Sequence, residues 1–167
     1  MENKPEVAPR AGFFKRLAAM VYDVLVAVAV GMCAALVIII TLLILFETQL
    51  ISKPEGVEFN QLMQDSLLYK SIIQAWVVAW VVGFFLWFWK NGGQTIGMRA
   101  WRLRMFAMDE KPVGYGRLLL RMLSAFLGLG TLFVLIDFKN KLALQDRVSK
   151  IEVLSLSKVA NDHKSWR

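Results

Sequence analysis

Apolar and polar residues follow one another in long blocks along this chain. A first apolar block runs from Leu17 to Phe46 and contains a single charged residue, Asp23. A second block, from Ser71 to Trp89, contains no charge at all. Each block is long enough to cross the hydrocarbon core of a bilayer as a helix, because about 20 helical residues span its ~30 Å. The pattern therefore predicts two transmembrane helices.

A third apolar run, from Leu118 to Ile136, is less regular than the first two. Arg121 interrupts its first turn, and the segment 128–130 contains two glycines. A full crossing would place the basic residues that follow on the outer side of the membrane, against the usual charge bias. A re-entrant segment keeps them inside, and broken backbone is tolerated at membrane depth when protein or a cavity surrounds it. Both arrangements stay open, and we favour the re-entrant one.

Charge is distributed unevenly among the polar stretches. Segment 47–70 has four acidic and two basic residues, whereas most lysines and arginines lie in 1–16, 90–121 and 137–167. Because basic residues collect in cytoplasmic loops, both termini are predicted to be cytoplasmic. The overall formal charge of +7 then indicates membrane topology and not nucleic-acid binding.

The cytoplasmic part is predicted to contain a small strand pair. A strand is predicted at 101–106, because apolar and basic side chains alternate from Trp101 to Met105 before Phe106 ends the pattern. The apolar segment 151–156 is its expected partner. The expected fold is thus a mainly α-helical membrane protein with two transmembrane helices, a third re-entrant or spanning segment and this strand pair.

Composition agrees with that fold class and sets the domain limits. Hydrophobic residues make up 57% of the 167 residues, and the mean hydropathy is +0.50. We expect a flexible tail over 1–10, one membrane domain over 11–156 and a polar tail over 157–167. The first apolar block is too long for the core of a signal peptide, so it is interpreted as an uncleaved span.

Asp23 is the residue whose position most needs a physical explanation. A carboxylate in hydrocarbon costs roughly 2.5–3.5 kcal/mol on insertion scales, so it normally has a partner, a water-filled cavity or a function. Arg16 precedes it by two helical turns and lies on the same face, about 10 Å away along the axis. Small residues recur at four-residue spacing around Asp23, which allows a second helix to approach closely. They are Ala19, Ala27, Gly31 and Ala35.

The sequence offers little support for enzyme chemistry. The single cysteine, Cys33, lies inside the first apolar block, and the single histidine, His163, lies in the polar tail. No spacing of metal ligands is visible. The glycines of 92–97 lack the lysine and spacing of a phosphate-binding loop. We expect no catalytic site, no cofactor, no metal and no nucleic-acid partner.

Three motifs in order resemble the RDD family of small bacterial membrane proteins, which is named for one arginine and two aspartates. They are Gly12-Phe13-Phe14-Lys15-Arg16 followed by Asp23, then Gly93-Gln94-Thr95-Ile96-Gly97-Met98-Arg99-Ala100-Trp101-Arg102-Leu103-Arg104, and last Leu144-Gln145-Asp146-Arg147-Val148-Ser149-Lys150. The resemblance covers roughly 11–156. It implies that Arg16, Asp23 and Asp146 are the signature residues.

Supporting residues carried over from the same motifs are Gly93, Gln94, Thr95, Gly97 and Arg147. The chain departs from the family pattern at Gln145, where histidine is common, and at Ile151, where threonine is common. A mechanism that needs a titrating histidine at position 145 therefore does not carry over to this chain.

Two functions follow from the sequence. The resemblance implies a small transporter or ion-coupled permease component in the bacterial inner membrane, with Asp23 as the ion or proton site. The alternative is a non-transporting membrane scaffold or assembly factor in which Arg16, Asp23 and Asp146 form a structural lock. Two or three apolar segments are few for a transport path through one chain. We therefore expect a homo-oligomer or a membrane-protein partner.

Overall fold

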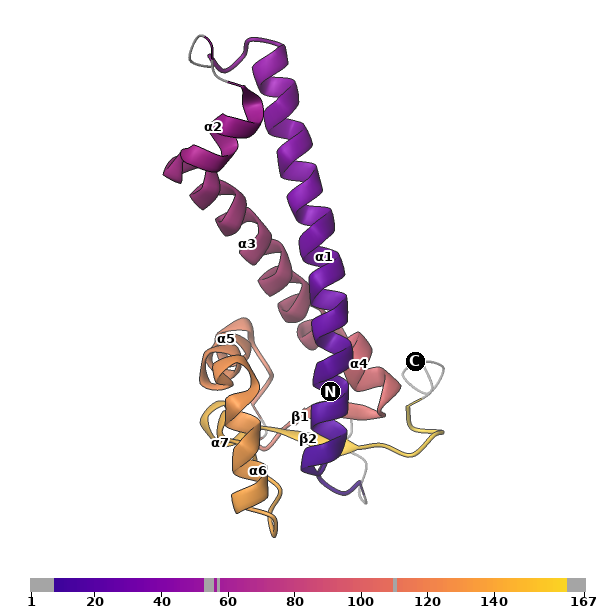
Figure 1. The fold of residues 1–167 in the computed structure, drawn as a ribbon. Coiled ribbons are helices and arrows are strands. Elements are labelled where there is room, and N and C mark those ends of the chain that lie inside the picture. The colour runs from indigo at the N-terminus through magenta and orange to yellow at the C-terminus, as the bar shows by residue number, and fades with distance from the viewer. Residues whose placement is uncertain (1–7, 53–55, 57, 110, 162–167) are drawn as a thin grey trace. The chain divides into compact units, whose positions relative to one another are not determined.

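The computed structural model describes residues 8–52, 56, 58–109 and 111–161. It is mostly helical, at 67% of the described residues. Two helices, α1 and α3, are long and apolar enough to cross a membrane, and a bent pair of shorter helices makes up to three candidate spans (Figure 1). The predicted fold class is thereby confirmed.

The two long helices extend beyond the apolar blocks from which they were predicted. Helix α1 is Phe13–Glu47, so it includes the aromatic and basic turn before Leu17. Helix α3 is Leu67–Gly92 and begins four residues before the predicted Ser71. A short helix, α2 at Phe59–Asp65, occupies part of the polar segment for which no element was predicted. Ser66, in extended conformation, separates α2 from α3.

The chain divides into two compact units, of which one is formed by residues 27–84. In this unit the indole N–H of Trp76 donates to the backbone oxygen of Ala34 at 3.1 Å. The ring of Phe46 meets that of Tyr69 edge to face, with centroids 5.6 Å apart. No residue of α3 is buried. Apolar side chains this exposed on two candidate spans are the surface that lipid covers.

The second unit combines the chain before residue 27 with the chain from residue 85 onward. Its centre is an antiparallel pair of strands, β1 at Leu103–Ala107 and β2 at Ile151–Ser155 (Figure 1). The register pairs the first residue of each strand with the last of the other. The predicted pairing of 101–106 with 151–156 is confirmed to within two residues.

Buried apolar side chains from the start of α1, the strands and the following helices form the core of this unit. They are Ala11, Ala19, Met98, Leu103, Met105, Leu118, Ile151 and Val153. Of the two predicted tails, residues 1–7 and 162–167, including His163, lie outside the described residues. The chain just before α1 joins the sheet, since Ser155 N donates to the oxygen of Pro9 at 2.8 Å.

Four short helices and a 3₁₀ segment complete the second unit. They are α4 at Ile96–Ala100, α5 at Tyr115–Ser124, the 3₁₀ segment η1 at Phe126–Leu132, α6 at Phe133–Ile136 and α7 at Leu144–Ser149.

The third apolar run is broken, as its glycines predicted. Its two halves, 115–124 and 128–136, meet at 79°. Phe126 and Gly128 both have positive φ, at 44° and 100°. Left-handed backbone cannot continue an α-helix, so the run bends there. A bent span and a re-entrant segment are both compatible with this geometry.

Candidate functional site

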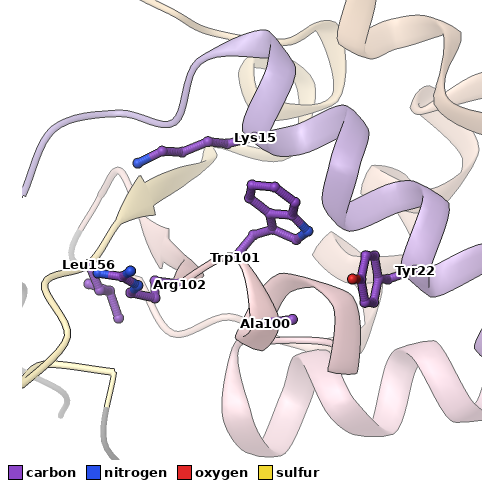
Figure 2. Close-up of a pocket in the computed structure, with 6 residues that line it drawn as sticks. All are labelled: Lys15, Tyr22, Ala100, Trp101, Arg102 and Leu156. Carbon is purple, nitrogen blue, oxygen red and sulfur yellow. The ribbon is translucent and has the colours of Figure 1, made fainter.

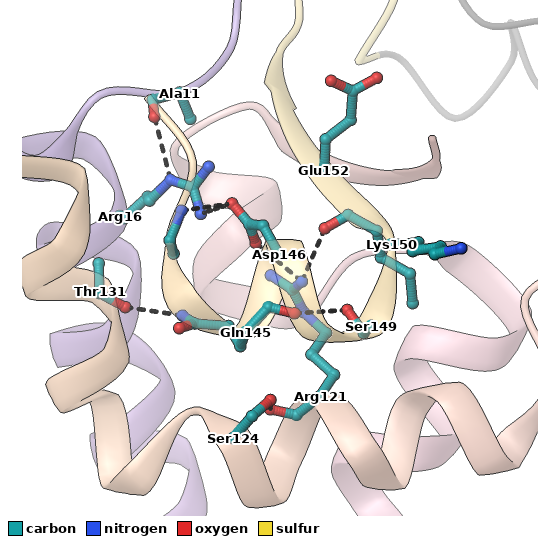
Figure 3. A network of polar contacts seen from close by, with 12 residues as sticks. Ala11, Arg16, Arg121, Ser124, Thr131, Gln145, Asp146, Ser149, Lys150 and Glu152 are labelled. Carbon is teal, nitrogen blue, oxygen red and sulfur yellow. Dashed lines mark hydrogen bonds and ion pairs between the residues drawn. The ribbon is translucent and has the colours of Figure 1, made fainter. Parts of the chain in front are cut away.

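The carboxylate of Asp146 is the centre of a buried charge cluster. Asp146 lies in the first turn of α7 and is 0% exposed. Arg16 Nη1 lies 2.7 Å from one carboxylate oxygen, and Arg121 Nη1 lies 2.8 Å from the other. Figure 3 shows both guanidinium groups turned toward Asp146. The aspartate therefore joins α1, α5 and α7, which are far apart in the sequence.

Backbone carbonyl groups hold both arginines in place. Arg16 Nε donates to Ala11 O at 3.0 Å, and its Nη2 donates to Lys141 O at 3.2 Å. Arg121 Nη1 donates to Ile151 O at 2.9 Å. The contact of Arg121 with Asp146 is close enough for an ion pair but lacks the alignment of a hydrogen bond. Two buried cations thus share one anion, and backbone carbonyl oxygens accept further hydrogen bonds from both of them.

Gln145, where the family commonly has histidine, has a packing role beside this cluster. Its amide nitrogen donates to Thr131 Oγ1 at 2.9 Å, and Ser149 Oγ donates to its backbone oxygen at 2.6 Å (Figure 3). A Cβ atom on Gly130 would lie 2.4 Å from the side-chain oxygen of Gln145. The glutamine side chain therefore fixes η1 against α7, and the glycine leaves it room.

Asp23 is buried as well, at 8% exposure, but it is satisfied differently. Thr95 Oγ1 donates to one carboxylate oxygen at 2.6 Å, and the backbone N–H of Gly97 donates to the other at 2.8 Å. Within the described parts of the chain, Asp23 forms no ion pair with any lysine or arginine. The sequence left open whether Arg16 or backbone donors satisfy Asp23, and the structure has a backbone donor, Gly97, together with the hydroxyl of Thr95. Arg16 is engaged by Asp146, so the signature trio does not form one cluster.

The segment 93–97 explains how Asp23 finds its donors. Gly93 has φ of +62°, which turns the chain after α3. Thr95 caps the N-terminus of α4 by accepting from Met98 N at 3.1 Å, while its hydroxyl proton goes to Asp23. A Cβ atom on Gly97 would lie 2.2 Å from Ala19 O. Glycine at this position therefore lets α4 touch the backbone of α1.

The other two supporting residues lie outside both carboxylate sites. Gln94 is buried, and its amide nitrogen donates to Asn161 Oδ1 at 2.9 Å. Arg147 forms an ion pair with Asp137 at the surface. The hydrogen bond from Arg147 lowers the pKa of Asp137, and hydrogen bonds from Asn140 lower it further. Gln94 and Arg147 thus stabilise local structure.

Arg121 is the site residue that the sequence reasoning did not single out. It had been treated as an interruption of an apolar run. It shares a helical face with Arg117 and Ser124, at spacings of four and three residues. A polar face of this kind inside an apolar segment indicates contact with buried polar groups, which was the missed signal.

Within the described ranges, no group of three or more histidine, cysteine, aspartate or glutamate side chains could hold a metal ion. A model of the RDD family matches residues 10–150, a range that contains Arg16, Asp23, Asp146 and the segment 93–97. No curated protein and no solved structure matches the chain.

Proposed function

The chain belongs to the RDD family, and on that premise we propose that this integral membrane protein is a component of an ion-coupled permease with Asp23 as its ion or proton site. One observation carries the proposal. Asp23 is a buried carboxylate on a candidate membrane span, and its hydrogen-bond donors among the described residues are neutral. Ionisable groups in such segments mark ion pathways and proton relays by default.

The two buried aspartates are suited to different tasks. A carrier must gain and lose a proton or cation, and at Asp146 two guanidinium groups already lie at ion-pair distance from the carboxylate oxygens. Asp146 is therefore suited to holding the fold. In the described part of the chain Asp23 has no basic side chain at ion-pair distance, so a proton or a small cation could bind it without displacing an arginine.

A transport path requires more than one chain under this proposal. Two or three spans enclose little space, and α3 buries none of its residues within the chain. We therefore propose a homo-oligomer, or a complex with another membrane protein. Cross-linking in native membranes followed by mass determination would test it, and a protein that stays monomeric in the bilayer while moving ions would contradict it.

We also propose that the protein lies in the bacterial cytoplasmic membrane with both termini inside and the third run re-entrant. The basic flanks support this orientation, because arginine and lysine are retained on the cytoplasmic side. Reporter fusions at each end test it. A periplasmic C-terminus would establish three crossings.

Flux through purified protein in oriented proteoliposomes tests the transport proposal. Native protein should move protons or a monovalent cation when a pH or ion gradient is imposed. Asp23→Asn should fold, since an amide oxygen still accepts a hydrogen bond, yet show no flux. Asp65→Asn is a matched control, because it makes the same change at an exposed position at the end of α2. Its flux should equal the native value.

The scaffold function remains the second candidate, and a different observation favours it. Asp23 links α1 to α4 through Thr95 and Gly97, which is what a structural link requires. Under this alternative, Asp23→Asn destabilises the protein and native protein shows no flux of any tested ion. That pair of results would replace the permease proposal.

A further inference from the structure

A polar hollow of about 360 Å³ lies beside the first turns of α1, apart from both aspartates. Figure 2 shows the side chains around it. They are Lys15, Tyr22, Ala100, Trp101, Arg102 and Leu156. Small-molecule sites in proteins typically have volumes of about 300–1,000 Å³, so the hollow could hold a small polar group.

The lining of the hollow is positively charged and has no acid. Lys15 and Arg102 are exposed, and in the described portion of the chain neither forms an ion pair with a carboxylate. Lys15 Nζ donates to the neutral Ser155 Oγ at 2.7 Å. The buried acid of the adjoining strand, Glu152, is engaged by Arg10 at 2.6 Å. Two cationic side chains are therefore available to an anion from outside.

Two aromatic side chains place the hollow at the boundary between polar and apolar surroundings. Trp101 and Tyr22 are 40% and 51% exposed. Each ring has a large apolar body and a polar tip, and such residues are enriched at the headgroup level of membranes. Lys15 lies in the first turn of α1 and Tyr22 two turns later, about 10 Å further along the axis. The lining thus follows α1 from its basic start into its apolar part.

The backbone at Arg102 is held in an unusual conformation. Its φ is +55°, in the left-handed region that residues other than glycine rarely adopt. Two hydrogen bonds fix it there: Arg102 N donates to Arg99 O at 3.1 Å, and Leu156 N donates to Arg102 O at 2.7 Å. Strained residues that the surrounding structure enforces are concentrated at ligand sites. These hydrogen bonds keep the backbone of Arg102 in place beside the hollow that its side chain lines.

We propose that this hollow binds the phosphate-bearing headgroup of an anionic phospholipid. Lys15 and Arg102 contact the phosphate, and the rings of Trp101 and Tyr22 border the glycerol and the start of the acyl chains. Arginine and lysine are the usual phosphate partners in proteins. A lipid is favoured over a soluble phosphate because the aromatic rings and the apolar turns of α1 adjoin the cations.

Retention of lipid by the purified protein tests the proposal. Native protein in detergent is titrated with phosphatidylglycerol or phosphatidylcholine, and bound lipid is counted by native mass spectrometry. Native protein should prefer phosphatidylglycerol. K15Q/R102Q should weaken its binding about tenfold or more, because each basic residue near an anionic surface contributes on the order of 1 kcal/mol. K15R/R102K keeps both charges and should bind at close to native strength.

The matched control is K111Q/K139Q, which removes two charges from exposed lysines outside the hollow. It should weaken phosphatidylglycerol binding less than about twofold, since those lysines do not contact the headgroup. Trp101→Leu keeps all charges and should weaken binding severalfold. Thermal unfolding of each variant verifies that it is folded.

Three results would overturn the proposal. If K15Q/R102Q and K111Q/K139Q lose phosphatidylglycerol binding equally, the binding depends on general surface charge and not on this hollow. Equal binding of phosphatidylglycerol and phosphatidylcholine by native protein would exclude an anionic headgroup site. Displacement of the lipid by micromolar inorganic phosphate or glycerol 1-phosphate would identify a soluble phosphate as the occupant and not a lipid.

Discussion

Asp146 and Asp23 are both buried carboxylates in the same compact unit, but different groups satisfy them. Asp146 has two arginines within ion-pair distance. Asp23 has one hydroxyl and one backbone N–H. Asp146 is paired with groups that carry a formal charge, whereas Asp23 is paired with neutral hydrogen-bond donors. Of the two, only Asp146 has a countercharge among the described residues, so the two signature aspartates of this chain are satisfied by different kinds of group.

The difference has an energetic consequence for each site. Removing one member of a buried ion pair leaves the other charged and uncompensated, which is the most costly outcome. Removing one neutral donor from a carboxylate costs less, because the lost hydrogen bond is worth about 1.5–3 kcal/mol when one partner is charged. We therefore expect the Asp146 cluster to be sensitive to any change, and the Asp23 site to tolerate conservative ones.

The largest effect should come from Asp146→Ala. This change leaves Arg16 and Arg121 buried together without an anion, so it should lower the free energy of unfolding by about 3–5 kcal/mol or prevent folding. Arg16→Ala should cost less, because Arg121 still balances Asp146. Thermal unfolding in detergent and the yield of folded protein measure both. An Arg16→Ala variant less stable than Asp146→Ala would contradict this assignment of charges.

The next largest effect should come from Gly97→Ala. The new Cβ would lie 2.2 Å from Ala19 O and 2.8 Å from an oxygen of Asp23, so α4 must move away from α1. Overpacking of this kind typically costs about 1–3 kcal/mol. Gly116→Ala is the matched control, because this glycine lies in α5 with nothing within 4 Å of its added Cβ. The control should be neutral or slightly stabilising in the same unfolding assay.

A smaller loss is expected for Thr95→Val. Valine has nearly the same shape but can neither donate to Asp23 nor accept from Met98 N. We expect a loss of about 1.5–2 kcal/mol, because a hydrogen bond to a carboxylate and a helix cap are both removed. Thr95→Ser keeps both hydrogen bonds and should restore most of the stability. If valine and serine variants unfold at the same temperature, the hydroxyl does not stabilise Asp23.

The smallest effect should be found at the surface pair of Arg147 and Asp137, and it should depend on pH. Arg147 lowers the pKa of Asp137, so the pair stabilises the fold above the ordinary aspartate pKa of about 3.9 and ceases to do so as pH falls through the lowered value. Arg147→Gln should therefore be less stable than native protein at neutral pH and equally stable below that value. Melting temperatures across this range measure the difference, and a constant gap would contradict it.

Much of the fold could be predicted from sequence because membrane spans and strands leave local patterns. The two long apolar blocks predicted α1 and α3, and the glycines of 128–130 indicated the break in the third run. Helix α2 was missed because it has only seven residues and no side chain caps its N-terminus. The early start of α3 was missed because Leu67 and Leu68 lie between polar residues. The mean hydropathy of this stretch is therefore lower than that of the apolar block that follows.

The site was predictable as a set of residues but not as a set of contacts. Arg16 and Asp23 share a helical face, which made their pairing the simplest local expectation. The actual partner of Arg16 is 130 positions away, at Asp146, and no local pattern specifies a contact at that distance. Likewise, Thr95 and Gly97 were identified as turn residues, but their role as donors to Asp23 depends on how α4 meets α1.

The distance in sequence between Arg16 and Asp146 also determines when their ion pair can form during synthesis of the chain. At about 5–20 residues per second, a ribosome needs roughly 7–26 s to extend the chain from the arginine to its aspartate. Helix α1 is therefore synthesised well before Asp146, the acid that pairs with its arginine. During that interval water or lipid headgroups must satisfy Arg16. Asp23 likewise lacks its donor Thr95 until 72 more residues have been added. The contact of Arg16 with Asp146 can therefore form only after α7 has been synthesised.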